Sequence, residues 1–133
     1  MPRKKRPPQK GRPDLTPLEL RIMQIVWDRG NATAQEVRDA LRDERPLADT
    51  TIHTVLANLR QKGYVEPVPT VERAFRFAPC VPRDEVAGRS VRQLLRDFFQ
   101  GSPKRLLAHL IAEETVDEAE LEEIQRLLQK QRK

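Results

Sequence analysis

The stretch from Pro46 to Val65 constrains the fold more than any other part of the chain. Its apolar residues recur at the spacing of one helical face, at Ile52, Val55, Leu56 and Leu59. The opposite face is polar but almost uncharged, whereas an ordinary solvated helix carries Glu and Lys four residues apart. Asp49 is expected to cap this helix and Gly63 to end it. The pattern fits a helix lying against base edges in a DNA major groove, and it also fits a buried helix whose Thr-rich side packs on another element.

Two helices are expected before this one. Each begins with a capping box, in which a Thr is followed three residues later by a Glu; the pairs are Thr16 with Glu19 and Thr33 with Glu36. The first helix should end at Gly30 and the second near Asp43. Two helices followed closely by a third match the helix-turn-helix arrangement, in which the last helix enters the groove.

After Gly63 the hydrophobic period changes from that of a helix to that of a strand. A first strand follows at once, and its prolines confine it to the edge of a sheet. A second strand is expected over residues 74–78, with Phe75 and Phe77 on one side and Arg76 on the other. The resulting hairpin is a wing, in which Arg73 and Arg76 either meet DNA phosphates or keep an exposed strand soluble.

The net positive charge of the chain is concentrated in its first residues. Residues 1–14 hold six Lys and Arg and one Asp, which equals the whole net charge of +5 of the 133 residues. This proline-rich basic arm cannot bury a core, so it is expected to be disordered. It either adds salt-sensitive affinity for phosphates or is a solubilising extension without a defined contact.

The C-terminal part, residues 81–133, reads as three short amphipathic helices. About fifty residues cannot bury so much large apolar surface on their own, so these helices need a partner, and a second copy is the simplest. The residues expected to bury in this dimer are Val91, Leu94, Leu95, Phe98, Phe99, Leu106, Leu107, Leu110, Leu121, Ile124 and Leu128.

Several classes of protein are not expected. A single cysteine, Cys80, excludes an internal disulfide framework, and no apolar run is long enough for membrane insertion, so we expect a cytoplasmic protein. The sequence offers no catalytic Ser/His/Asp set and no Gly-rich phosphate loop, so neither an enzyme nor a cofactor is expected. A metal or redox site formed by His53, His109 and Cys80 is a weaker hypothesis, since their spacing matches no zinc pattern.

The motifs LTPLELRIMQIVW, TAQEVRDAL, TTIHTVLANLRQKGYV and RAFRFAP together resemble the penicillinase and methicillin-resistance repressor family of the BlaI/MecI type. The resemblance covers roughly residues 15–131. It implies a winged-helix DNA-binding domain followed by a helical dimerisation domain, and a dimer that occupies a palindromic operator. It also implies release by a membrane sensor metalloprotease, with His109 and Leu110 matching the cleaved pair, where the antibiotic-responsive members have Asn-Phe.

We therefore expect a mainly α fold with a small β-wing: a basic arm at 1–14, a winged-helix domain at 15–80 and a dimerisation domain at 81–133. The function expected is that of a homodimeric, sequence-specific transcriptional repressor. Bases would be read by His53, Thr54 and Asn58, and phosphates held by Thr50, Thr51, Arg60, Lys62, Arg73 and Arg76. The alternatives are a winged-helix adaptor that binds protein and a metal- or redox-responsive regulator.

Overall fold

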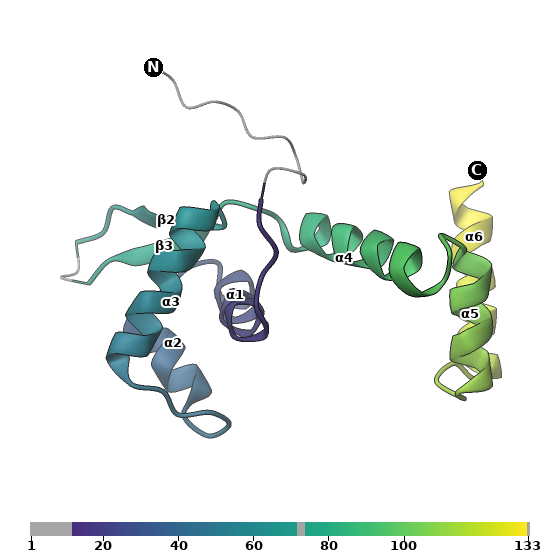
Figure 1. Cartoon of the computed structure of the whole chain (residues 1–133), viewed down its shortest axis with the longest axis horizontal. Coiled ribbons are helices and arrows are strands. Elements are labelled where there is room, and N and C mark those ends of the chain that lie inside the picture. The colour runs from purple at the N-terminus through teal and green to yellow at the C-terminus, as the bar shows by residue number, and fades with distance from the viewer. Residues whose placement is uncertain (1–11, 72–73, 133) are drawn as a thin grey trace, which may run out of the picture. The chain divides into compact units, whose positions relative to one another are not determined.

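The computed structural model describes residues 12–71 and 74–132. In chain order the described elements are α1 (Pro17–Arg29), β1 (Ala32–Thr33), α2 (Ala34–Leu41), α3 (Asp49–Lys62), β2 (Val65–Val68), β3 (Arg76–Pro79), α4 (Arg83–Phe98), α5 (Pro103–Ala112) and α6 (Glu118–Gln131) (Figure 1). The chain divides into two compact units, Met1–Arg89 and Ser90–Lys133. We call them the winged-helix unit and the C-terminal unit.

Both predicted capping boxes in the winged-helix unit are confirmed. The hydroxyl of Thr16 accepts a hydrogen bond from the Glu19 N–H (3.1 Å), while the Glu19 carboxylate accepts one from the Thr16 N–H (2.8 Å). Thr33 and Glu36 repeat the arrangement at the start of α2, with distances of 3.0 and 3.1 Å. These bonds satisfy N–H groups that the first turn of a helix cannot pair internally, so the local sequence fixes where α1 and α2 begin.

The start of α3 differs from the expectation. Ala48 is its N-cap, without a side-chain cap, and Asp49 is the first helical residue. The Asp49 carboxylate instead accepts a hydrogen bond from Arg38 Nη1 of α2 (2.9 Å), so the predicted cap is wrong. The predicted end is confirmed, because Gly63 adopts the left-handed conformation (φ 91°, ψ 19°) that costs glycine little.

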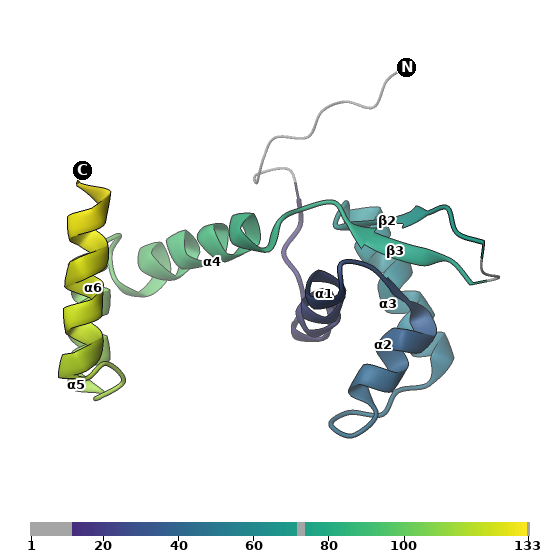
Figure 2. The same ribbon diagram turned by 180° about the vertical axis from the view of Figure 1, so that it is seen from behind.

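The three strands form one antiparallel sheet in the order β1-β3-β2. The β2–β3 hairpin is the predicted wing, and β2 holds the edge position that its proline requires (Figure 2). The strand β1 was not predicted, because two residues are too few for a periodic pattern. It pairs Ala32 with Phe77 and Thr33 with Arg76, which fixes the base of the wing against the start of α2.

The core of the winged-helix unit is made by aliphatic side chains from all three of its helices. The fully buried members include Ile22, Met23 and Val26 of α1, Val37 and Leu41 of α2, and Ile52 and Leu59 of α3. Burying each such side chain is worth about 1.5–3 kcal/mol. The apolar side of α3 is therefore the side that holds this helix in the fold.

The winged-helix unit extends beyond the sheet into α4. Val81 and Val86 are both buried in its core, and the unit continues to Arg89. The expected division fell after residue 80, at the sequence change from strand to helix. The observed division falls at Arg89, because the first turns of α4 pack with the core of the winged-helix unit.

The C-terminal unit is helical and lacks buried side chains in α5 and α6. Side chains cap two of its helices: Ser102 caps α5 by accepting from the Arg105 N–H (3.1 Å), and Asp117 forms a capping box with Glu120 at α6. Among the described residues, no helix is long and apolar enough to cross a membrane.

Replacing a buried leucine by alanine should lower the free energy of unfolding more than replacing an exposed leucine. Leu59→Ala removes a fully buried side chain from α3, so the free energy of unfolding should fall by about 2–5 kcal/mol. The matched control is Leu20→Ala on α1, whose side chain is 37% exposed, and the loss there should stay below about 1 kcal/mol. Urea unfolding followed by circular dichroism measures both, and equal losses would contradict the assignment of the buried face.

Candidate nucleic-acid interface

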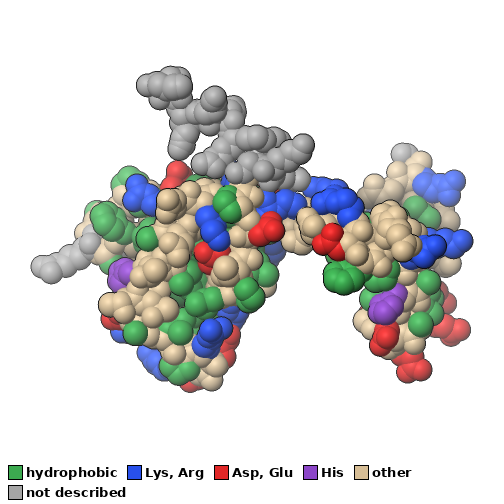
Figure 3. Space-filling view, in the orientation of Figure 1, with side chains coloured by type: hydrophobic (Ala, Val, Ile, Leu, Met, Phe, Trp, Pro, Cys, Tyr) green, Lys and Arg blue, Asp and Glu red, His purple; other side chains and the backbone are tan. Residues whose placement is uncertain are grey.

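The polar face of α3 is open to solvent. Its exposed residues are Thr50, His53, Thr54, Ala57, Asn58 and Gln61, with Thr51 half-buried at its edge. In the space-filling view, the surface over α3 carries few charged side chains (Figure 3). The alternative in which the Thr-rich side packs on another element is therefore wrong for the described part of the winged-helix unit. The helix presents hydroxyl, amide and imidazole groups, which are the groups that recognise base edges.

A cleft of 330 Å³ lies between the start of α2, the first turns of α3 and the wing. It is lined by Ala34, Gln35, Arg38, Asp49, His53, Ala74, Phe75 and Phe77. Neither Gln35 nor Arg38 was predicted from the sequence. A signal for them existed, because Val37 and Leu41 mark the inner side of α2, and Gln35 and Arg38 share the other side at a spacing of three.

The two phenylalanines of the wing lie in different environments. Phe77 is half-buried and packs against the core, whereas Phe75 is 69% exposed. The sequence pattern placed both on one side of a strand over residues 74–78. In the structure β3 begins only at Arg76, so Phe75 lies outside the ladder and the alternation does not reach it.

Arg76 is engaged within the winged-helix unit. Its guanidinium group donates to both carboxylate oxygens of Glu36 (3.1 and 3.0 Å) and to Oδ1 of Asn31 (2.9 Å). The hydrogen bonds from Arg76 are the main reason why the pKa of Glu36 lies below its ordinary value, against a smaller opposing effect of burial. A phosphate would have to compete with this paired geometry for Arg76.

Lys62 is engaged in a similar way. Its Nζ lies 2.6 Å from Oε1 of Glu19, whose side chain is only 6% exposed, and 3.0 Å from the carbonyl oxygen of Asp14. Burial raises the pKa of Glu19, but the hydrogen bonds from Lys62 and Thr16 outweigh it and leave the pKa below its ordinary value. Arg60, by contrast, is exposed and follows His53 by two helical turns on the same flank of α3.

Two expected contributors fall outside the described residues. These are Arg73, which falls between β2 and β3 in the sequence, and residues 1–11 of the basic arm. The arm is described only from Arg12 to Asp14, which lies against the winged-helix unit through Gly63 and Tyr64.

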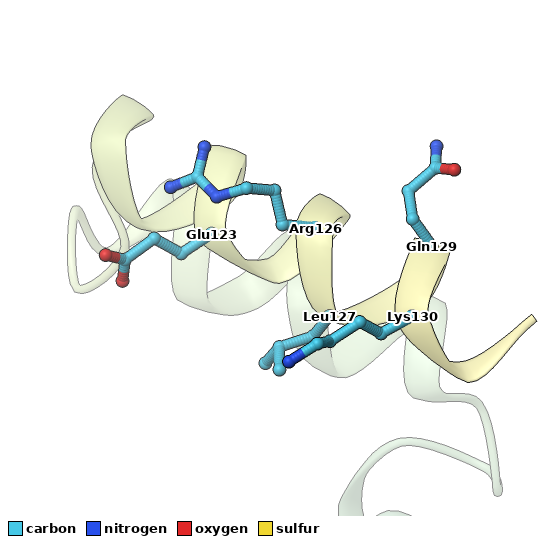
Figure 4. Close-up of a pocket in the computed structure, with 5 residues that line it drawn as sticks. All are labelled: Glu123, Arg126, Leu127, Gln129 and Lys130. Carbon is cyan, nitrogen blue, oxygen red and sulfur yellow. The ribbon is translucent and has the colours of Figure 1, made fainter. Parts of the chain in front are cut away.

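The residues expected at the dimer contact are exposed or half-buried. The exposed ones are Val91, Leu94, Phe98, Ile124 and Leu128, and the half-buried ones are Leu95, Phe99, Leu106, Leu107, Leu110 and Leu121. Hydrophobic side chains gather on the surface of this unit (Figure 3). A shallow depression of 680 Å³ runs along α6, lined by Glu123, Arg126, Leu127, Gln129 and Lys130 (Figure 4).

The residues of the metal hypothesis lie on different elements of the chain. His53 belongs to α3, Cys80 is an exposed residue after β3, and His109 lies in α5 with its ring edge-on to Phe99 (5.6 Å between centroids). Over residues 12–71 and 74–132, no group of three or more His, Cys, Asp or Glu side chains is placed to hold a metal ion.

Comparison with known proteins decides the family. A family model described as the penicillinase repressor matches residues 15–130. This chain belongs to the penicillinase repressor family. It is 38% identical over 105 residues to the transcriptional regulator BlaI of Mycobacterium tuberculosis (strain ATCC 25618 / H37Rv), covering 77% of this chain and 75% of that protein. It is 19% identical over 117 residues to the methicillin resistance regulatory protein MecI of Staphylococcus aureus (strain N315), covering 88% and 94%.

Solved structures are also similar. The complex structure of hsRosR-S4 superposes with a TM-score of 0.52 at 16% identity, over 77% of this chain and 90% of that chain. The Bacillus licheniformis BlaI monomer in complex with the blaP half-operator gives a TM-score of 0.48 at 25% identity, over 55% and 88%. The family expected from the sequence is confirmed, and so is the mainly α, winged-helix fold class with its small β-wing.

Because Glu36 is paired with Arg76, we expect the free energy of unfolding of this protein to depend on pH. Because the folded-state pKa of Glu36 is lowered from 4.5, its contribution is present above that value and is lost as the pH falls through the folded-state pKa. Glu36→Gln removes the titrating group, so its free energy of unfolding should start lower near neutral pH and fall less between about pH 5 and pH 3.

The measurement is urea unfolding across that pH range. Glu66→Gln, a substitution at an exposed residue of β2, serves as the control and should follow the wild-type profile. A Glu36→Gln profile that runs parallel to that of the wild type would show that the pair does not contribute to acid sensitivity.

Proposed function

We propose that this member of the penicillinase repressor family acts as a homodimer that binds a palindromic DNA operator and blocks transcription. The observation that carries the proposal is the two-sided character of α3. One side is buried in the core at Ile52 and Leu59, and the other is open, polar and almost uncharged from Thr50 to Gln61. A helix held in this way can enter a major groove without rearrangement of the fold.

The base contacts assigned to this helix are those of His53, Thr54 and Asn58. Asn58 can bond both N6 and N7 of adenine, His53 can donate to or accept from a base edge, and Thr54 offers a hydroxyl and a methyl group that fits the methyl group of thymine. Thr50 and Thr51 stand at the N-terminus of α3, where hydroxyl and backbone N–H groups favour a phosphate.

Two of the residues expected to bind phosphates are paired with glutamates within the winged-helix unit, so we assign the phosphate contacts mainly to other residues. Lys62 and Arg76 are held by Glu19 and Glu36, so we assign them to the frame of the winged-helix unit. Arg60 remains an exposed cation beside the base-reading residues, and Gln35 and Arg38 line the cleft between α3 and the wing. A DNA strand that passes between groove-bound α3 and the wing would cross this cleft. Arg73, which lies outside the described residues, keeps its expected role as a phosphate contact.

Dimerisation is assigned to the C-terminal unit because several of its large apolar side chains are exposed. Phe98, Leu127 and Leu128 are 72%, 60% and 58% exposed, and α5 and α6 have no buried residue. Large exposed apolar side chains that gather on one unit are typical of an interface. A second copy would cover these side chains, because in a two-fold dimer the same patch serves both partners.

The proposal includes release by a membrane metalloprotease that cuts at His109 and Leu110. Both residues lie in α5, and their carbonyl groups accept hydrogen bonds from Glu113 (3.0 Å) and Thr115 (2.9 Å). Cleavage would therefore require local unwinding of α5. A helix without buried side chains unwinds at low cost, so such unwinding would expose this position to cleavage.

The competing function is that of an adaptor whose wing and cleft bind a protein, and exposed Phe75 is the observation that favours it. The two proposals differ in their response to DNA. An operator-binding repressor retards a fragment of its own promoter at physiological salt in the presence of excess random DNA, whereas an adaptor does not.

Substitutions at Asn58 and Arg60 should separate base reading from phosphate binding. Asn58→Ala should reduce the preference for operator over random DNA by about 1–3 kcal/mol while leaving the salt dependence of affinity unchanged. Arg60→Ala should weaken binding to both kinds of DNA alike and reduce the salt slope by about one for each phosphate that Arg60 neutralises. Fluorescence anisotropy at several salt concentrations measures both quantities, and an exchange of the two phenotypes would reverse the assignments.

A charge placed on the exposed apolar surface of the C-terminal unit should break the dimer. Phe98→Glu would bury an unpaired carboxylate at the interface, so the dissociation constant of the dimer should rise by at least about tenfold. Sedimentation equilibrium measures it. Leu20→Glu on α1, which also places an acid at an exposed apolar position but outside this unit, is the control and should leave the dimer intact. A Phe98→Glu protein that sediments as the wild type would place the interface elsewhere.

A further inference from the structure

The first turns of α4 are tied to the winged-helix unit by Arg89. Its Nη1 donates to the carbonyl oxygen of Arg12 (3.0 Å), and its Nη2 donates to the hydroxyl of Tyr64 (2.6 Å). The planar guanidinium group can reach both acceptors at once, whereas a lysine ammonium group lacks this fork. Arg89 thus joins α4 to the N-terminal segment and to the residue that follows the C-cap of α3.

The segment from Arg12 to Asp14 completes this connection. The Tyr64 hydroxyl donates to the carbonyl oxygen of Pro13 (2.6 Å), and Arg12 Nε donates to the carbonyl oxygen of Gly63, the C-cap of α3 (3.1 Å). The same Arg12 guanidinium lies 3.5 Å from the Glu85 carboxylate of α4. We call these six residues, Arg12, Pro13, Gly63, Tyr64, Glu85 and Arg89, the arginine clasp.

The arginine clasp is shielded from solvent. Tyr64 is fully buried, and the side chains of Arg12 and Arg89 are 15% and 19% exposed. Hydrogen bonds from charged donors are stronger than neutral ones, and they lose less to solvent screening when they are partly buried. These contacts therefore restrain the start of α4 more firmly than exposed pairs such as that of Arg42 with Asp39.

A second set of contacts holds the start of α4 from α1. Trp27 Nε1 donates to the carbonyl oxygen of Val81 (2.8 Å), and Arg83 lies over the Trp27 ring (5.6 Å to its centroid) and pairs with Asp28. With α1 and the end of α3 both engaged, the first turns of α4 are fixed to the winged-helix unit at two places.

We propose that the arginine clasp sets the spacing between operator half-sites that the dimer accepts. The inference rests on the proposed homodimeric function, in which α4 leads from each DNA-reading unit to the dimer contact. Arg12, Tyr64 and Arg89 would act as positioning residues, since none belongs to the polar face of α3. A change of one base pair in spacing also rotates one half-site by about 35°, so a restrained α4 makes the dimer strict about spacing.

Arg89→Lys and Tyr64→Phe test the clasp in the full-length chain, because both keep the net charge and so the general attraction to DNA. The probes are a single half-site duplex and palindromic duplexes, selected with the wild-type protein, with spacers altered by one or two base pairs. Affinity for the half-site should stay within about twofold of wild type. The affinity penalty for altered spacing should shrink by at least about fivefold, since a charge-assisted hydrogen bond is worth about tenfold or more.

Arg96→Lys is the matched control, because Arg96 lies further along α4 and donates to Gln93 of the same helix (3.1 Å). It should change neither quantity. Equal loss of half-site and palindrome affinity, or an unchanged spacing preference, would overturn the proposal. If circular dichroism shows that the Arg89→Lys protein is unfolded, the result with Tyr64→Phe decides the test. A wild-type protein that selects no palindrome and shows no gain over the half-site would instead remove the proposed dimeric function, and this inference with it.

Discussion

The division of α3 into a buried side and an open side is the constraint on which the winged-helix unit depends. Ile52, Leu56 and Leu59 fix the helix in the core, so its polar face needs no structural contact of its own. That freedom allows the face to consist of groups that distinguish bases, which need hydrogen-bond geometry more than charge. Charge on this face would strengthen binding to every sequence alike. The excess positive charge of the chain lies instead in residues 1–14, outside α3.

The glutamates of the two capping boxes connect local structure to tertiary structure. Glu19 accepts the Thr16 N–H and also binds Lys62 from the end of α3, while Glu36 accepts the Thr33 N–H and also binds Arg76 from β3. Each carboxylate thus caps its own helix and joins it to an element about forty residues away. This double use explains why the pKa values of both groups are lowered although burial acts in the opposite direction.

The contacts of these two glutamates show which features can be predicted from a sequence and which cannot. The helix starts at Thr16 and Thr33 and the helix end at Gly63 depend on neighbours within a few residues, so the local pattern was sufficient. The partners of Lys62 and Arg76 depend on contacts between distant segments, and a lone cation in a sequence resembles a phosphate ligand whether or not it is paired. The cleft beside His53 could not be predicted for the same reason, because it is formed only where three elements meet. The division between the two units inside α4 has no local signal either, because the helical pattern continues unbroken across it.

In the proposed dimer, α4 would connect association of the two copies to DNA reading. Its first turns belong to the core of the winged-helix unit through Val86 and Arg89, whereas Val91, Leu94 and Phe98 further along are exposed apolar residues. In the proposed dimer, a C-terminal unit without buried side chains in α5 and α6 would gain much of its stability from the partner, so its order would depend on the concentration of dimer. Dissociation of the proposed dimer would leave the polar face of α3 intact, because α3 is held by the core of the winged-helix unit. On the proposed function, release from an operator would then follow from the loss of two-site binding and not from a change in α3.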